Sequence, residues 1–216
     1  ADSGPARGLP QVEVRAGRER AFLAGAALRP LADSALRARS AGLSVGDLLT
    51  ATGAGFGRVR APGGIVAASQ RGLGGEHTAV LWQGLPLNSP MLGLADLSLL
   101  PLAAFDEVTL QQGPGGGVHG SGLVGGGLHL GARAPAAGTE RLRLGAVAGA
   151  YGQGGALAAW QRGGARTALS LRAFHQQARN DYFFENTTLF GAPRERQRNA
   201  AWRQTGALAD VWHTLS

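Results

Sequence analysis

The chain contains no lysine and no cysteine, and Ile65 is its single isoleucine. Without cysteine it can form neither a disulfide framework nor a thiolate metal site. Without lysine it cannot build the lysine-dependent phosphate loop of nucleotide-binding proteins. Arginine, alanine, glycine and leucine dominate instead, which is the bias of a GC-rich genome. The formal net charge of +7 is therefore a weak sign of function.

Positive charge can mark a nucleic-acid surface. Here the arginines are scattered, with clusters at Arg18–Arg20 and Arg194–Arg198. No aromatic residues are interleaved with the first cluster. We expect no nucleic-acid partner.

Long apolar runs are missing as well. None approaches the ~20 residues that a membrane helix needs. Strands of a transmembrane β-barrel would not be excluded, because they carry only a weak alternating signal. The first residue is Ala1, and no apolar signal region follows it. The pattern is that of a processed chain or a fragment.

Motifs for catalysis and metal binding are also lacking. Ser121 is outside a G-x-S-x-G frame because position 119 is histidine, and the histidines show no metal-ligand spacing. The glycine run matches G-x-G-x-x-G at Gly115–Gly120 and Gly120–Gly125, but Gly127–Gly131 alternates like a strand. A dinucleotide loop would open a helix there. We expect no catalytic residue, metal or cofactor, and no enzyme.

The first part of the chain predicts short helices and strands. Asp33 can cap a helix at Ser34–Arg39, and Ser44 can cap one from Val45 to about Thr52. Asp47 is favourable near the start of the second helix, and Gly53 can end it. The expected strands are Val59–Arg60, Ile65–Gln70, Thr78–Trp82 and Phe105–Gln112, with a turn at Pro62–Gly64.

Beyond a linker at residues 134–138 the sequence alternates with period two. Leu142 and Leu144 share one face of a strand, while Arg141 and Arg143 share the other. Two more such segments follow, separated by glycine turns and by a long polar loop from about Asn180 to Asn199. A transmembrane barrel and a soluble antiparallel meander both show this pattern.

One longer run carries a resemblance. It extends from Arg71 to Arg133 and begins with an Arg-Gly pair, followed by a short apolar strand that ends at Gln83-Gly84. The stretches Leu85–Asn88 and Ala95–Ser98 come next, and a glycine-rich hairpin at 120–126 is the last motif. This order resembles the plug domain of TonB-dependent outer-membrane receptors, closest to the vitamin B12 (cobalamin) branch. The resemblance covers roughly residues 9–134. It implies an α+β plug domain, with a small mixed sheet and short helices, followed by an incomplete antiparallel transmembrane β-barrel of about four strands.

The resemblance also implies a division of the chain. Residues 1–20 would be a flexible N-terminus with a candidate TonB box, 21–134 the plug, and 139–216 the first barrel strands. The TonB box would pair edge-on with the TonB energy-transducing protein by strand addition. Its residues would be Leu9, Val12, Glu13 and Val14. An ordinary first strand of the plug explains the same alternation, and both interpretations stay open.

Further site residues come from the same resemblance. The apical substrate loop would be Leu87–Gly93, with Leu87, Asn88, Ser89, Met91 and Leu92 as contacts and Gly72–His77 as a second candidate loop. Arg71 would dock on barrel carboxylates. Gly72, Gly84, Gly113, Gly120 and Gly125 would be structural glycines that permit positive φ or close backbone approach. Gln83 accepts a left-handed turn less readily than Asp or Asn, so another turn type is expected at Gln83-Gly84.

The resemblance leads to one functional hypothesis and its alternatives. The chain would be the N-terminal part of a receptor in the cell outer membrane, with the plug facing the periplasm and outer-membrane lipid around the barrel. A plugged barrel has about 22 strands, so this length holds only the first of them. The substrate would be a large nutrient, with cobalamin favoured over an iron–siderophore. A free-standing plug that binds a partner without transport is the alternative from another class.

Overall fold

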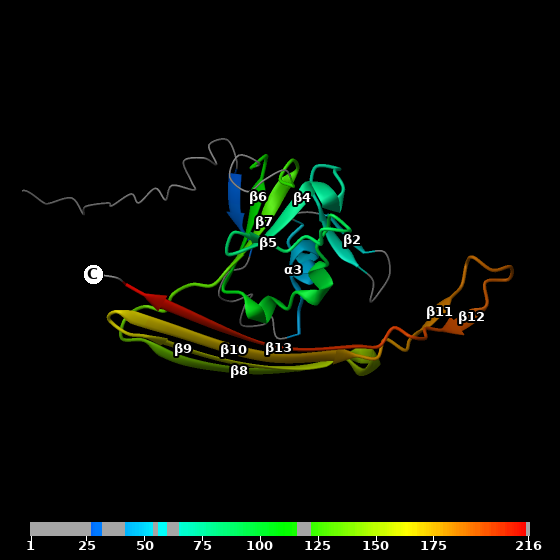
Figure 1. The fold of residues 1–216 in the computed structure, drawn as a ribbon. Coiled ribbons are helices and arrows are strands. Elements are labelled where there is room, and N and C mark those ends of the chain that lie inside the picture. The colour runs from blue at the N-terminus through cyan, green and yellow to red at the C-terminus, as the bar shows by residue number, and fades with distance from the viewer. Residues whose placement is uncertain (1–26, 32–41, 54–55, 60–64, 116–121, 215–216) are drawn as a thin grey trace, which may run out of the picture.

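The computed structural model describes residues 27–31, 42–53, 56–59, 65–115 and 122–214. The helix expected at Ser34–Arg39 lies outside these ranges. The described residues form two parts, a mixed α+β domain and a long curved sheet beneath it (Figure 1). This confirms the fold class expected from the sequence.

The mixed domain is organised around a five-stranded sheet in the order β1-β6-β7-β4-β5. β4 and β7 pair in parallel, and the other neighbours are antiparallel. The short apolar run expected as a strand is β4. The strand bounds are β1 Ala27–Pro30, β4 Thr78–Trp82, β5 Leu85–Pro86, β6 Glu107–Gln112 and β7 Gly126–Gly131.

Helix α3 (Val45–Ala51) begins where its capping residues predict. Ser44 Oγ accepts a hydrogen bond from the Asp47 backbone N–H at 3.1 Å. Asp47 Oδ2 in turn accepts from the Ser44 backbone N–H at 2.8 Å. This reciprocal capping box satisfies two N–H groups that the first turn leaves unpaired. Gly53, with φ +58°, follows the helix.

The remaining elements of the mixed domain are short. A two-stranded sheet pairs β2 with β3, close to the strands expected there, while the turn between them at 60–64 lies outside the described residues. The bounds are β2 Phe56–Val59, β3 Val66–Ser69, η1 Gly75–His77, η2 Leu97–Leu99 and η3 Leu102–Ala104.

The core of the mixed domain is apolar. The largest fully buried side chains are leucines and valines together with Gln111, and α3 contributes Leu48 and Leu49 on one face. Sheet strands supply Leu110, Leu128 and Leu130 opposite them. Burial of such side chains stabilises a fold by ~1.5–3 kcal/mol each before entropy is subtracted.

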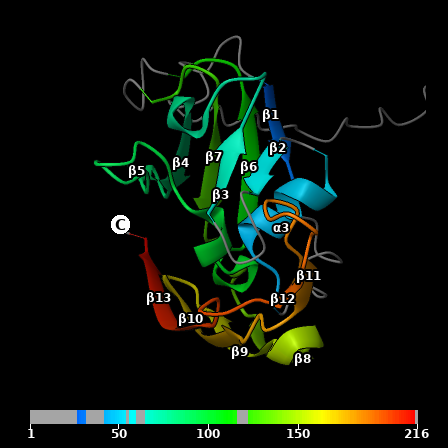
Figure 2. The same ribbon diagram turned by 90° about the vertical axis from the view of Figure 1, so that its right-hand side faces the viewer.

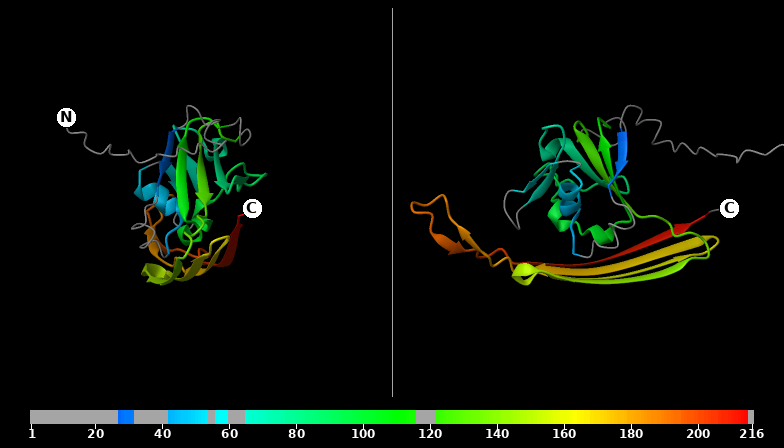
Figure 3. Two further views of the ribbon diagram at one scale, coloured as in Figure 1. Left: turned by 90° about the vertical axis from the view of Figure 1, so that its left-hand side faces the viewer. Right: turned by 180° about the vertical axis from the view of Figure 1, so that it is seen from behind.

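The curved sheet has four antiparallel strands in the order β13-β10-β9-β8. Its strands are β8 Glu140–Ala148, β9 Gly154–Gly163, β10 Thr167–Ala178 and β13 Trp202–His213. The short helix η4 (Ala150–Gly152) joins β8 to β9. End-on views show the sheet bending around the underside of the mixed domain (Figures 2 and 3).

Alternation gives this sheet two unlike faces. We call the face toward the mixed domain the inward face and the other the outward face. On β10, Ser170, Arg172 and Phe174 face inward and are buried. On the same strand Leu171 faces outward and is 48% exposed, and Leu144 on β8 is 71% exposed. The sheet therefore buries polar groups and exposes apolar ones.

The long connection between β10 and β13 is more ordered than its polar sequence indicated. It contains a hairpin of β11 (Phe183–Glu185) and β12 (Arg194–Arg196), which projects beyond the sheet at the end away from the C-terminus (Figures 1 and 3). Tyr182 packs edge-on against Tyr151 at 5.5 Å between ring centroids, and the Arg194 guanidinium lies over the Phe183 ring. Aromatic contacts therefore order a segment that the sequence presents as a loop. No helix of the described residues is long and apolar enough to cross a lipid bilayer.

One local expectation was wrong. Gln83 and Gly84 both have positive φ, +49° and +86°, as a two-residue type I′ turn requires, so glutamine adopts the left-handed conformation after all. Glu76 and His77 lie in η1, and His77 Nε2 is 3.7 Å from Glu76 Oε1.

Candidate functional site

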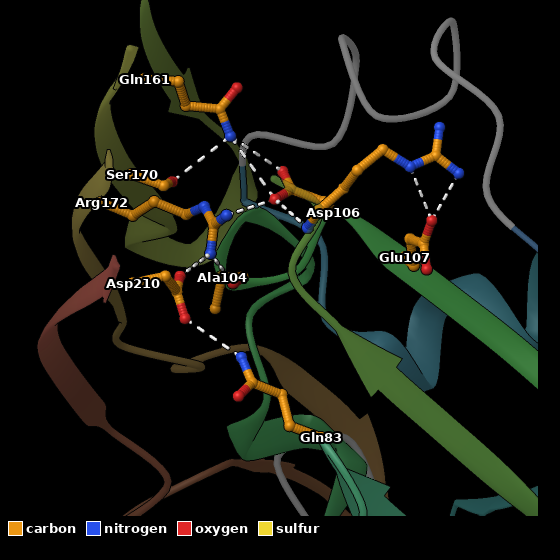
Figure 4. Close-up of polar contacts among 9 residues, drawn as sticks. Gln83, Ala104, Asp106, Glu107, Gln161, Ser170, Arg172 and Asp210 are labelled. Carbon is orange, nitrogen blue, oxygen red and sulfur yellow. Dashed lines mark hydrogen bonds and ion pairs between the residues drawn. The ribbon is translucent and has the colours of Figure 1, made fainter. Parts of the chain in front are cut away.

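A buried cluster of charges joins the mixed domain to the curved sheet (Figure 4). At its centre is Arg172 of β10, whose side chain is 1% exposed. Its Nη2 forms an ion pair with Asp106 Oδ2, just before β6. Its Nη1 pairs with Asp210 Oδ2 of β13 at 3.0 Å and donates to the carbonyl oxygen of Ala104 at 3.1 Å. One guanidinium therefore links two strands of the sheet with the mixed domain.

Amide side chains extend this cluster along the interface. Gln161 Nε2 lies 3.4 Å from both carboxylate oxygens of Asp106 and donates to Ser170 Oγ at 3.3 Å. On the other side, Gln83 Nε2 donates to Asp210 Oδ1 at 3.1 Å. The cross-domain contacts therefore come from neighbouring positions on three strands of the sheet.

Electrostatics explains why these groups are paired. A charge removed from water costs several kcal/mol unless an opposite charge and hydrogen bonds replace its hydration. Arg172 meets a carboxylate on each side, and the side chains of Asp106 and Asp210 are themselves only 13% and 12% exposed. The pairing fixes the position of the domain on the sheet more than it adds stability, because buried ion pairs roughly balance their desolvation cost.

A second contact lies further along the inward face. Gln204 of β13 donates from Nε2 to the carbonyl oxygen of Leu99 at 2.7 Å. Near it, Leu157 and Phe174 of the sheet belong to the same apolar cluster as the core of the mixed domain. The interface thus combines a charged cluster near the C-terminal end of β13 with apolar packing toward the other end.

The two candidate substrate loops, Gly72–His77 and Leu87–Gly93, lie side by side. A side chain at Gly93 would meet Glu76 Cβ at 3.3 Å, and one at Gly75 would meet Leu94 Cβ at 3.4 Å. Both loops are at the Thr78 end of β4. The Gln83-Gly84 turn, which contacts Asp210, is at the opposite end of that strand.

Within the loop Leu87–Gly93 the five candidate contact residues have different surroundings. Met91 is 95% exposed and Leu92 62% exposed, whereas Leu87 packs against the core. Asn88 braces the loop: its Oδ1 accepts from the Val80 N–H at 2.8 Å, and its Nδ2 donates to two carbonyl oxygens. Ser89 accepts a bond from the Leu92 N–H at 3.4 Å. The exposed apolar pair is therefore the part of the loop presented outward, while both amide N–H groups of Asn88 are already used.

Arg71 and the glycines are placed as follows. Arg71 is exposed in a turn with φ +53°, and it forms no ion pair with any residue that the structure describes. Gly72, Gly84 and Gly113 have positive φ. Gly125 does not, but a side chain there would lie 3.0 Å from Leu73 Cδ1 and 3.1 Å from the His77 carbonyl oxygen; the left-handed position is the next residue, Gly126. Gly120 lies outside the described residues.

The TonB-box candidates Leu9, Val12, Glu13 and Val14 also lie outside the described residues. Sequence reasoning missed the role of Arg172, which lies in one of the alternating segments that follow the first. An arginine at an otherwise small or polar inward position was the available signal. Its partner Asp106 could not be deduced, because the pairing crosses from one domain to the other. Among the described residues no group of acidic residues and histidines could hold a metal ion.

Comparison with known proteins bears on this arrangement. Residues 32–127 match the family model described as the TonB-dependent Receptor Plug Domain. Over 60 residues the chain is 37% identical to the vitamin B12 transporter BtuB of Vibrio vulnificus (strain YJ016), a stretch that is 28% of this chain and 10% of the relative.

Two solved structures share the fold of both parts. The copper transporter OprC superposes with a TM-score of 0.60 at 20% identity over 80% of this chain and 25% of that one. The ferric yersiniabactin uptake receptor FyuA from Yersinia pestis gives 0.54 at 14% identity, over 86% and 28% of the two chains. The chain thus spans about a quarter of these structures. Its mixed domain is a TonB-dependent receptor plug domain, and its curved sheet has the fold of an incomplete antiparallel barrel.

Proposed function

We propose that this chain works as part of a TonB-dependent receptor that takes up a large nutrient across the outer membrane. The observation that carries the proposal is the seating of the plug: Arg172 holds Asp106 of the plug against a sheet whose opposite face is apolar and exposed. A barrel wall in lipid has this inverted character, with a polar interior and an apolar exterior. The sheet would be wall, and the plug would block the lumen.

The proposed mechanism needs a pull on the plug from the periplasmic side. The segment Leu9–Ala16 alternates as a strand-addition partner does, and we assign TonB binding to Leu9, Val12, Glu13 and Val14. The Arg172 cluster would hold the plug in place until that force acts. Arg71 remains the candidate for a second docking contact with barrel strands beyond this chain.

For the substrate we propose cobalamin. The match to the vitamin B12 transporter supports it, as does the exposed apolar pair Met91 and Leu92 on a loop with few charges. An iron–siderophore is the second candidate, because FyuA shares the fold. The substrate would meet Leu87–Gly93 and Gly72–His77 from outside, and Asn88 would keep the first of these loops in shape.

Cobalamin uptake by the intact receptor tests the proposal. Val12→Pro removes a backbone N–H that strand addition needs and should abolish uptake while substrate binding is kept. Met91→Gly with Leu92→Gly should weaken cobalamin binding at least ~10-fold, which is ~1.4 kcal/mol, while the receptor still inserts into membranes. Leu85→Gly is the matched control, because Leu85 is 65% exposed on a different part of the plug. Normal uptake by Val12→Pro would refute the TonB assignment, and a wild-type receptor that binds ferric siderophore but no cobalamin would refute the substrate.

A further inference from the structure

The outward face of the curved sheet changes character at one end. In its middle, paired positions run Leu144, Ala158, Ala173 and Ala207 across the four strands. Toward the β11–β12 hairpin, the corresponding row holds Ala148, Gly154, Gln177 and Arg203. The apolar surface therefore gives way to polar groups within two rows.

A hollow of about 640 Å³ lies at this end. Gly152 and Gly154 form part of its lining and contribute no side chains to fill it. Arg179 bends over Gly152, with its Cδ 3.2 Å from the position that a Cβ would take there. Arg179, Arg203, Gln153 and Gln177 supply the polar side chains of its lining. Two guanidinium groups thus border a space that small residues keep open.

The charge of this hollow is not neutralised from within the chain. None of the lining residues is acidic, and neither Arg179 nor Arg203 makes an ion pair with any residue in the described ranges. Arg179 contributes to the lowered pKa of Asp181, but this carboxylate forms its ion pair with Arg196, whose Nη2 is 2.6 Å from Asp181 Oδ2. The hollow is therefore bordered by two exposed arginines that have no acidic partner among the described residues.

We infer that this hollow binds the phosphate of an anionic lipid headgroup in the outer leaflet. The inference rests on the proposed function, which places the outward face in lipid. Barrels have short periplasmic turns and long extracellular loops, so the end that leads into the long β10–β13 connection is the outer one. Guanidinium groups match phosphate oxygens in charge and in paired hydrogen-bond geometry. The apolar rows in the middle of the same face suit the acyl chains of the same lipid, with the row that contains His175 and Thr205 between them and the hollow.

The length of the strands agrees with this placement. Nine-residue β8 spans ~30 Å along its axis at ~3.3 Å per residue. A tilt of ~40° reduces its height to ~23 Å, close to the ~25 Å apolar band of membrane barrels. The hollow lies where β8 ends, at the boundary between hydrocarbon and headgroups. A soluble anion would have no reason to meet a site flanked by an apolar wall.

The test measures lipid binding by the intact receptor. Bisphosphorylated lipid A and its dephosphorylated form are titrated into receptor in phosphatidylcholine nanodiscs, and binding is followed by native mass spectrometry. The double variant Arg179→Gln, Arg203→Gln should lose at least ~10-fold in affinity for the phosphorylated lipid and nothing for the other. The control Arg162→Gln, Arg166→Gln removes the same charge from exposed arginines at the opposite end of the sheet and should bind as wild type does.

The outcomes separate the inference from the proposed function. Equal binding of the two lipids, or equal loss in both double variants, would overturn the lipid site. Competition by millimolar inorganic phosphate would show that the hollow takes free phosphate and would overturn the headgroup assignment. Membrane insertion is scored independently by heat-modifiable migration of the folded receptor. A receptor that inserts yet binds no phosphorylated lipid refutes this inference alone, whereas a chain that never enters outer membranes refutes the proposed function.

Discussion

The plug and the curved sheet handle polarity in opposite ways. The plug buries Leu110 and Leu128 completely in an apolar core, as a water-soluble domain does. The sheet buries Arg172 and Ser170 and leaves Leu144 and Leu171 exposed. The difference lies in the medium that each surface is expected to meet. Water would surround the plug, whereas the sheet would meet lipid on its outward face and the plug on its inward face.

This contrast shows that burial alone does not identify a core. In the plug, hydrophobic burial stabilises the fold. At the interface, specificity comes from a few charged contacts that fix one position of the plug against the wall. The same interface also contains apolar packing at Leu157 and Phe174, and under the proposed mechanism it must hold the plug at rest and release it when it is pulled.

The largest effect is expected from breaking the charged contact. Arg172→Leu leaves Asp106 and Asp210 buried without their common partner, which costs ~3–5 kcal/mol in comparable sites. The plug should then separate from the wall at a lower urea concentration. Limited proteolysis of the plug in the intact, membrane-inserted receptor measures the shift.

A triple variant is the control for this prediction. Adding Asp106→Asn and Asp210→Asn to Arg172→Leu removes the unpaired charges as well, so most of the lost stability should return. If the triple variant is as unstable as Arg172→Leu alone, packing rather than charge holds the plug.

The second prediction tests the exposed side of the sheet. Leu171→Arg places a charge in the apolar rows of the outward face, which costs ~2–4 kcal/mol near the bilayer midplane. Thr167→Arg, on the same strand and face but at its end, should cost only ~0–1 kcal/mol. Urea titrations of receptor folded in lipid vesicles give both values. Equal costs at the two positions would indicate that this face meets water or protein instead.

Much of this architecture could be predicted from local sequence. Ser44 and Asp47 specify the start of α3 because capping involves only neighbouring residues, and alternation around Leu142 gave the two faces of β8. The Arg172–Asp106 contact could not be predicted, because it joins positions from two domains whose relative placement no local pattern encodes. The type I′ turn at Gln83 was missed for a related reason: Gln83 donates to Asp210, a distant contact that can favour a conformation which glutamine otherwise rarely adopts.

The third prediction concerns the loop that would receive substrate. Asn88→Ala removes the acceptor of the part-buried Val80 N–H and the donor to two carbonyl oxygens. Unpaired buried groups cost ~1–3 kcal/mol, so the plug should lose stability and the loop its shape. Ser89→Ala affects one long contact and should change stability by less than ~0.5 kcal/mol. Thermal unfolding of the two variants side by side distinguishes a bracing role for Asn88 from direct substrate contact, in which binding falls but stability does not.

The smallest effect is expected at an exposed version of the same arginine–aspartate chemistry. The hydrogen bond from Arg196 is the main reason that the pKa of Asp181 lies below its ordinary value of 3.8, with Arg179 a lesser cause. Because the pKa is lowered in the folded state, the contact contributes to hairpin stability above the unfolded value and is lost as the pH falls through the folded value. Arg196→Gln should raise the pKa of Asp181 toward 3.8, as followed by carboxylate NMR between pH 2 and 6.

Arg198→Gln removes a nearby exposed charge without touching this bond and should leave the titration almost unchanged. If both variants shift the midpoint equally, general charge rather than the paired geometry sets it. The exposed pair would then differ in kind from the buried Arg172 cluster, where geometry decides which carboxylates are held.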